Sequence, residues 1–75
     1  MMRRNRAHWL YQISLAEHTP YPFRFGRGVY HLRRWLWKHG LVEVATPNES
    51  VVLTAKGHAS LRQWTVDAAR HGLKL

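Results

Sequence analysis

The sequence has 75 residues and no cysteine. A disulfide framework and a cysteine-based zinc site are therefore excluded, and nothing indicates an oxidising compartment. A chain of this length buries only roughly 60% of the surface that its unfolded form exposes, so its stability margin is small. Packing, a partner or self-association must then supply the reinforcement that other small domains take from disulfides or metals.

Acidic residues are also scarce, with four Asp and Glu against twelve Lys and Arg, and the formal net charge is +8. Such an excess favours polyanions at low ionic strength. Nine of the twelve cations are arginines, whose planar fork pairs bidentately with phosphate or guanine. We therefore expect a nucleic-acid partner, with duplex DNA favoured and RNA as a further alternative.

Long apolar runs are absent as well. No run approaches the roughly 18 apolar residues of a membrane span, and residues 1–18 lack the uninterrupted apolar core of a secretory signal. We therefore expect a cytoplasmic protein that does not bind membranes.

The residues needed for catalysis are few. None of the six histidines forms an i, i+4 pair around a carboxylate on one helix, and no serine or glycine stands in a nucleophile or phosphate-loop motif. Asp67 and His71 form an i, i+4 pair near the end of the last expected helix, and we interpret it as a structural pairing. The sequence thus predicts a protein that is not an enzyme and uses no cofactor or metal.

The first six residues have the composition of a basic N-terminal arm, followed by one domain over residues 7–75. The cations of this segment are Arg3, Arg4 and Arg6. With no apolar side chain beyond two methionines, the arm is expected not to pack. It is either a frayed, solubilising terminus or an arm that follows phosphates along nucleic acid, and both interpretations stay open. A helix capped by Asn5 is expected to run to Ala16 and to bury Trp9.

Residues 19–28 hold two prolines and two glycines, which exclude a full helix. Aromatic residues alternate with others here, as in an edge strand or a pinned extended loop. They are Tyr21, Phe23 and Phe25. Arg24 and Arg27 project from this segment as candidate phosphate contacts. Gly26 and Gly28 would admit a phosphate at the start of the next helix, but we favour the simpler interpretation that they form the turn into it.

Residues 29–40, VYHLRRWLWKHG, carry two different faces of one helix. At about 100° per residue, the core side holds Val29, Leu32, Trp35 and Leu36, and the other side holds Tyr30, His31, Arg33, Arg34, Trp37 and Lys38. Gly40 suits a left-handed C′ position with Leu41 at C″, which predicts a Schellman ending. Trp37 is either covered by neighbouring residues or exposed, and an exposed Trp beside Arg suits nucleic acid and protein partners alike.

The remaining sequence predicts a hairpin and a final helix. Apolar, β-branched runs at residues 41–45 and 50–53 flank the turn residues 46–49. Thr54 is expected to cap a helix from Ala55 to about His71, which Gly57 weakens slightly. One core is expected to hold Leu10, Ile13, Leu32, Leu36, Leu53, Leu61 and Trp64. The predicted fold class is α+β, with about three helices and a hairpin of two strands, or of three if residues 21–25 pair with it.

The order of these motifs resembles the winged helix-turn-helix family of transcription regulators. In that family a recognition helix ends in Gly followed by LV or LI, a hairpin wing follows, and an LT-x-KG segment starts the next helix. The matching segments here are GLVE at residues 40–43 and VVLTAKG at residues 51–57, together with Leu32 and Leu36, all within residues 29–61. The sequence departs from the family pattern in having no room for a full helix directly before residue 29, and no Lys or Arg at the wing tip, residues 46–49.

The resemblance implies a winged-helix-like domain that places the 29–38 helix in the major groove and the wing on the backbone or minor groove. With the basic residues noted above, the candidate nucleic-acid-binding residues are Arg3, Arg4, Arg6, Arg24, Arg27, Tyr30, His31, Arg33, Arg34, Trp37 and Lys38. We therefore expect a small DNA-binding protein, a transcriptional or mobile-element accessory regulator. The alternative is a protein-interaction module that docks on a larger nucleic-acid-processing machine through the same aromatic and arginine face. A homodimer is predicted from Tyr11 and Leu15, which lie off the buried stripe of the first helix.

Overall fold

The computed structural model describes residues 2–45 and 50–72. Its elements are α1 (Arg4–Ala16), α2 (Tyr30–Lys38), β1 (Val42–Ala45), β2 (Ser50–Leu53) and α3 (Ala55–Arg70). The predicted α+β class, with three helices and a two-stranded hairpin, is confirmed for this part of the chain. The predicted wing tip, residues 46–49, lies outside the described residues.

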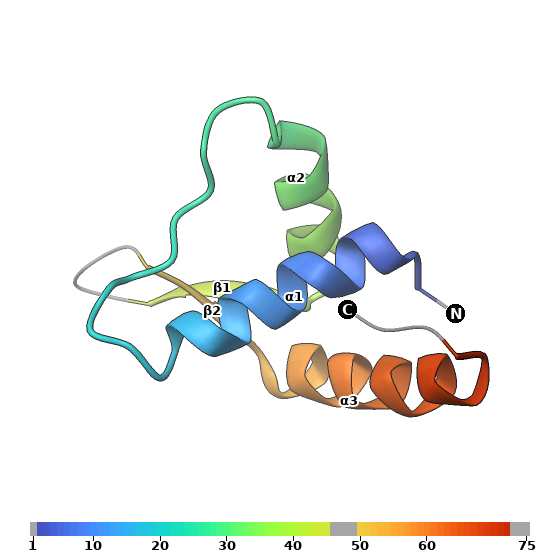
Figure 1. The fold of residues 1–75 in the computed structure, drawn as a ribbon. Coiled ribbons are helices and arrows are strands. Elements are labelled where there is room, and N and C mark those ends of the chain that lie inside the picture. Colours follow the sequence, from blue (N-terminus) through green and yellow to red (C-terminus); the bar gives the residue numbers. More distant parts are fainter. Residues whose placement is uncertain (1, 46–49, 73–75) are drawn as a thin grey trace.

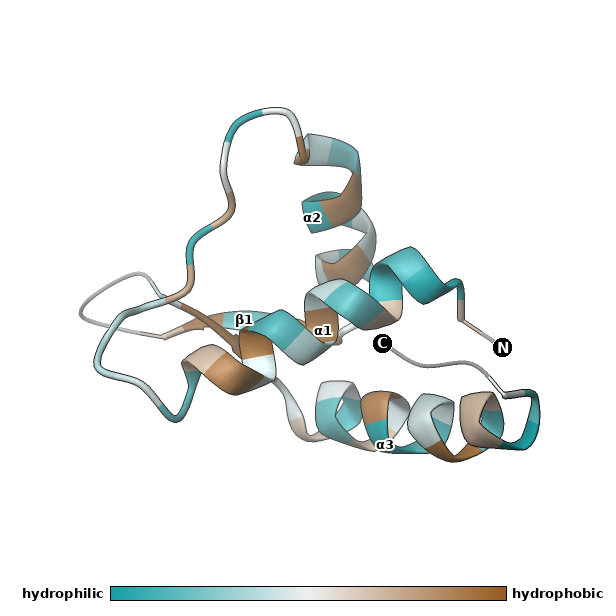
Figure 2. Cartoon of the chain, in the orientation of Figure 1, coloured by the Kyte–Doolittle hydropathy of each residue, from teal (hydrophilic) through white to brown (hydrophobic). Residues whose placement is uncertain are grey.

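Two helices and the hairpin form the base on which α2 stands. α1 and α3 lie side by side and run in opposite directions, and the hairpin lies at one end of the pair (Figure 1). The strands are antiparallel, with Val42 opposite Leu53 and Val44 opposite Val51. Each helix carries both apolar and hydrophilic residues (Figure 2), as helices with one buried face do. α2 packs on β1 and rises from the base, so that much of its surface is open.

α2 ends as its sequence predicts. The Leu41 N–H donates to the Leu36 oxygen and the Gly40 N–H to the Trp37 oxygen, both at 3.0 Å. Gly40 has a φ of 70°, the left-handed conformation that glycine adopts without steric cost. These two bonds and this conformation define a Schellman motif, which turns the chain directly into β1.

Thr54 joins the hairpin to α3. Its Oγ1 accepts a hydrogen bond from the Gly57 N–H at 3.0 Å, which confirms the predicted cap, and its own N–H donates to the Leu41 oxygen at 3.1 Å. Gly57 has a role that helix propensity does not reveal. A Cβ atom at this position would overlap the Leu41 carbonyl oxygen and lie 3.0 Å from its carbon. The first turn of α3 therefore packs on the turn after α2 at a distance that only glycine permits.

The core consists of two clusters, where the sequence predicts one. The larger cluster contains Leu10, Ile13, Leu36, Leu41, Val42, Val51 and Leu53, with Leu32 and Leu61 partly buried against it. Trp64 is buried instead with Ala7 and Ala68. The single-core prediction is wrong for Trp64, because the small alanines leave room for its indole between α1 and α3, away from the hairpin. Met2 packs against both clusters.

Met2 and Arg6 pack against the rest of the domain, so the expectation that the basic arm does not pack is wrong for these two residues. α1 begins at Arg4, and its N-cap is Arg3 instead of Asn5, without a side-chain cap. The Met2 carbonyl oxygen accepts a hydrogen bond of 2.7 Å from the Trp64 Nε1. The donor lies 62 positions away in the chain, so local sequence patterns give no sign of this anchor.

The proline-rich connection between α1 and α2 forms no strand in the described residues. One backbone hydrogen bond ties it to the hairpin, from the Val51 N–H to the Phe23 oxygen at 2.9 Å. The rings of Phe23, Phe25 and Trp9 pack together, with centroids 5.3 to 6.0 Å apart. Of the two interpretations, the structure supports the pinned extended loop. Trp9 covers this loop and is only half-buried, because the innermost positions of α1 belong to smaller residues.

Two acidic side chains, Glu17 and Asp67, make further polar contacts. The Glu17 Oε1 accepts from the Leu53 N–H at 2.7 Å, and its Oε2 lies 3.1 Å from the His58 Nε2, so this carboxylate links the end of α1 to β2 and α3. In α3, the Asp67 Oδ1 accepts from the Gln63 amide at 3.0 Å. The predicted pairing of Asp67 with His71 is not formed, because His71 is the C-cap residue and has left the helical conformation.

Candidate nucleic-acid interface

The outward face of α2 is open to solvent as a whole. Its six side chains are all exposed: Tyr30, His31, Arg33, Arg34, Trp37 and Lys38. Trp37 is 57% exposed and Tyr30 56%. The interpretation in which neighbours cover Trp37 is therefore wrong. Leu36 is the fully buried residue of this helix, and the next position lies about 100° around the axis, away from the core.

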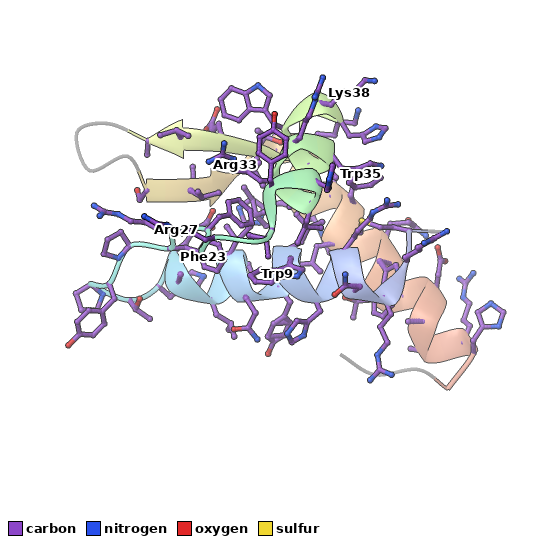
Figure 3. The ribbon with its side chains drawn as sticks, turned by 90° about the horizontal axis from the view of Figure 1, so that it is seen from above. Trp9, Phe23, Arg27, Arg33, Trp35 and Lys38 are labelled. Carbon is purple, nitrogen blue, oxygen red and sulfur yellow. The ribbon has the colours of Figure 1, made fainter. Side chains whose placement is uncertain are left out.

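Five of the residues predicted for binding line one groove between α2, the preceding loop and the hairpin. They are Arg24, Tyr30, Arg33, Arg34 and Trp37. The groove has a volume of about 920 Å³. Figure 3 shows Arg33 on the side of α2 that faces the hairpin. Its guanidinium carbon lies 5.8 Å from the centre of the Tyr30 ring, within the range of a cation–π contact.

The other half of this groove was not predicted from the sequence. Its remaining lining residues are Phe25, Val42, Glu43, Val44 and Val51. Val44 is 46% exposed although it lies in a strand. The alternation of Val42 and Val44 was the available signal, because it places both on one face of β1. The hairpin therefore supplies an apolar surface opposite the cations of α2.

The other predicted residues lie around the groove. Arg27 lines a smaller adjoining hollow with Tyr30 and Arg33. Gly28, at the turn into α2, has a φ of 91°, which supports the turn interpretation for this glycine. His31 and Lys38 are exposed on α2 but do not line the groove. Lys38 stands in the last helical turn, where a cation also suits the helix dipole.

The N-terminal cations are divided between two environments. Arg3 and Arg4 are exposed at the start of α1. The Arg6 guanidinium carbon lies 4.0 Å from the centre of the Trp35 ring, and Trp35 lies on the opposite side of α2 from Arg33 (Figure 3). Arg6 therefore holds α1 against α2, and only Arg3 and Arg4 resemble the freely exposed cations of the predicted arm.

The charged side chains of α2 are all cationic. α2 contains two arginines and a lysine but no acidic residue. Among the described acids, Glu17 and Asp67 have partners elsewhere, and Glu43 alone lines the groove. Within residues 2–45 and 50–72, no group of His, Asp and Glu has the make-up of a metal site, and no helix there has the length and apolar character to cross a bilayer.

We found no match to this chain among protein-family models, curated proteins or solved structures. A functional assignment therefore depends on the chemistry of the α2 face. Guanidinium groups bind phosphates and guanine edges, and exposed aromatic rings stack on bases or anchor protein partners.

Proposed function

We propose that this chain is a small DNA-binding protein that contacts duplex DNA through α2. The observation that carries the proposal is the open α2 face, on which Arg33 and Arg34 lie beside a groove shared with the hairpin. An α-helix fits the major groove of B-DNA, and arginine is the side chain that most often contacts guanine there. The formal net charge of +8 supports binding to a polyanion.

A winged-helix-like arrangement is the finer fold assignment that we propose. The order of α2, a Schellman turn, the β1–β2 hairpin and the Thr54-capped α3 supports it. In this assignment α2 is the recognition helix and the hairpin is the wing. An extended loop, instead of a helix, precedes α2.

Phosphate contacts are assigned to the loop and to the start of α1, because the wing tip carries no Lys or Arg. Arg24 and Arg27 lie on the loop before α2, and Arg3 and Arg4 are exposed at the start of α1. Phosphate contacts orient a protein on DNA, and base contacts give specificity. A regulator of transcription or of a mobile element would need both, and this surface offers candidates for each.

The test compares two double variants that remove the same charge from different faces. Arg33→Ala/Arg34→Ala alters α2, and Arg62→Ala/Arg70→Ala alters exposed residues of α3. Each is titrated by fluorescence anisotropy, at two salt concentrations, against a duplex selected from a random pool by the unaltered protein and against an unselected duplex. Circular dichroism verifies that both variants are folded.

We expect the α2 variant to lose about 1–3 kcal/mol on the selected duplex for each base contact removed, and much less on the unselected one. The α3 variant should bind both duplexes nearly as the unaltered protein does. If the α2 variant binds the selected duplex normally, the proposal is wrong.

A protein partner is the second candidate, and the exposure of Trp37 and Tyr30 beside two arginines favours it, because Trp, Tyr and Arg are enriched in interface hot spots. The chain would then dock on a nucleic-acid-processing machine through the same face. In a pull-down after nuclease treatment, the Arg33→Ala/Arg34→Ala variant should lose a partner that the unaltered protein retains. Its weak, salt-sensitive affinity for DNA should remain almost unchanged in this case, which separates the two candidates.

A further inference from the structure

Exposed aromatic surface on α2 is concentrated at the groove. Tyr30 and Trp37 are seven positions apart, two turns along one face, and both are more than half exposed. Val44 faces the same groove from β1. Leaving this much apolar surface in water beside three arginines is unfavourable unless a partner covers it.

Apart from Glu43, the groove has an apolar and aromatic part and a cationic part. Phe25, Val42 and Val51 contribute apolar lining, and these side chains offer no hydrogen bond to a base edge. Cationic side chains come from Arg24, Arg33 and Arg34. A ligand that matches both parts has a flat, weakly polar face and an attached anionic group. A nucleobase with its phosphate has this chemistry.

The faces of bases are hidden in a continuous duplex, where side chains reach only the base edges in the grooves. Unpaired bases can instead stack on aromatic side chains. We infer that the groove receives an unpaired base, and that the preferred ligand is DNA in which a duplex adjoins unpaired nucleotides. This inference rests on the proposed function, because it requires that the α2 face binds DNA.

The size of the preference follows from the stacking free energy. Stacking of one base on an aromatic side chain contributes ~1–3 kcal/mol, which corresponds to a roughly 5- to 140-fold change in affinity. At equal phosphate number the electrostatic term favours the duplex, because its charge density is higher than that of single strands. A preference for DNA with unpaired nucleotides therefore cannot come from the phosphates and reports stacking.

The experiment measures the affinity for a fully paired duplex and for a forked duplex of equal nucleotide number at one salt concentration. It uses the unaltered protein, Trp37→Leu and Tyr21→Leu. Trp37→Leu removes the aromatic ring from the groove but keeps an apolar, helix-favouring side chain. Tyr21→Leu is the matched control, since Tyr21 is 77% exposed and does not line the groove.

We expect the unaltered protein and Tyr21→Leu to bind the fork at least about 5-fold more tightly than the duplex. Trp37→Leu should lose this preference and bind the two DNAs with similar affinity. Equal affinity of the unaltered protein for the two DNAs would overturn the inference and leave the proposed function standing, and so would a fork preference that survives in Trp37→Leu. If neither DNA binds at all, the proposed function fails as well.

Discussion

Replacing Gly57 by Ala separates the effect of local helix propensity from that of tertiary packing, because the two predict opposite changes in the free energy of unfolding. Ala is favoured over Gly in helices by about 1 kcal/mol, so a local argument predicts a more stable protein. In the structure, a Cβ atom at this position overlaps the Leu41 carbonyl oxygen and lies 3.3 Å from the Leu53 Cβ. A backbone oxygen cannot rotate away as a side chain can, so α3 must shift.

The shift has two costs that can be estimated. Overpacking a close contact costs about 1–3 kcal/mol. Moving the first turn of α3 also weakens the Thr54 cap on the Gly57 N–H, and a lost cap costs about 0.5–2 kcal/mol. After the gain in helix propensity is subtracted, Gly57→Ala should lower the free energy of unfolding by about 0.5–4 kcal/mol. For a domain of this size each kcal/mol lowers Tm by roughly 4–8 °C.

Urea and thermal unfolding, followed by circular dichroism and tryptophan fluorescence, measure this loss. Gly26→Ala is the matched control, because a Cβ atom at Gly26 has no neighbour within 4 Å and the residue does not have a positive φ. That variant should unfold at or slightly above the Tm of the unaltered protein. If Gly57→Ala is as stable as the unaltered protein, the close approach of α3 to Leu41 does not exist.

Three further predictions concern the core, the assembly and the N-terminus. Leu36→Ala removes a fully buried side chain and should cost about 2–5 kcal/mol in urea unfolding; an unchanged midpoint would contradict the assignment of Leu36 to the core. Tyr11 and Leu15 are exposed on α1 and are the predicted homodimer interface. If they form it, Leu15→Glu should yield monomers in sedimentation velocity. A monomer mass for the unaltered protein at high micromolar concentration would rule the dimer out. Arg3→Ala/Arg4→Ala should weaken binding to every duplex alike and reduce the salt slope by up to about 0.9 per lost phosphate contact; a sequence-dependent loss would contradict this role.

Features that depend on neighbouring residues could be predicted from the sequence. The Schellman ending at Gly40 and the Thr54 cap each require only a few consecutive residues, and both are present. The two faces of α2 follow from helical periodicity, which correctly placed Leu36 inside and Arg33 and Arg34 outside.

Features that depend on distant contacts could not be predicted in this way. Met2 packs against Trp64, and Arg6 lies over Trp35. These contacts join different elements, and local sequence patterns do not show them. The N-terminal segment was therefore interpreted as an arm that does not pack. Gly57 was interpreted by propensity alone, because only the three-dimensional approach to Leu41 reveals the second constraint. The hairpin half of the groove was not identified, because the alternation of Val42 and Val44 indicates only that they share one face of β1, and the position of that face beside α2 is a tertiary feature.

The most direct test of the α2 interface is an NMR titration of the indole N–H signals with DNA, using duplex and forked ligands in turn. The chain has four tryptophans, and the Trp37→Leu variant assigns the signal of Trp37. The α2 interface predicts that this signal and the backbone amides of Arg33 and Arg34 shift or broaden on binding. The backbone amides of Arg62 and Arg70, two exposed residues of α3, should stay in place. Shifts confined to α3, with the Trp37 signal unchanged, would contradict the assignment of the α2 face as the DNA-binding surface.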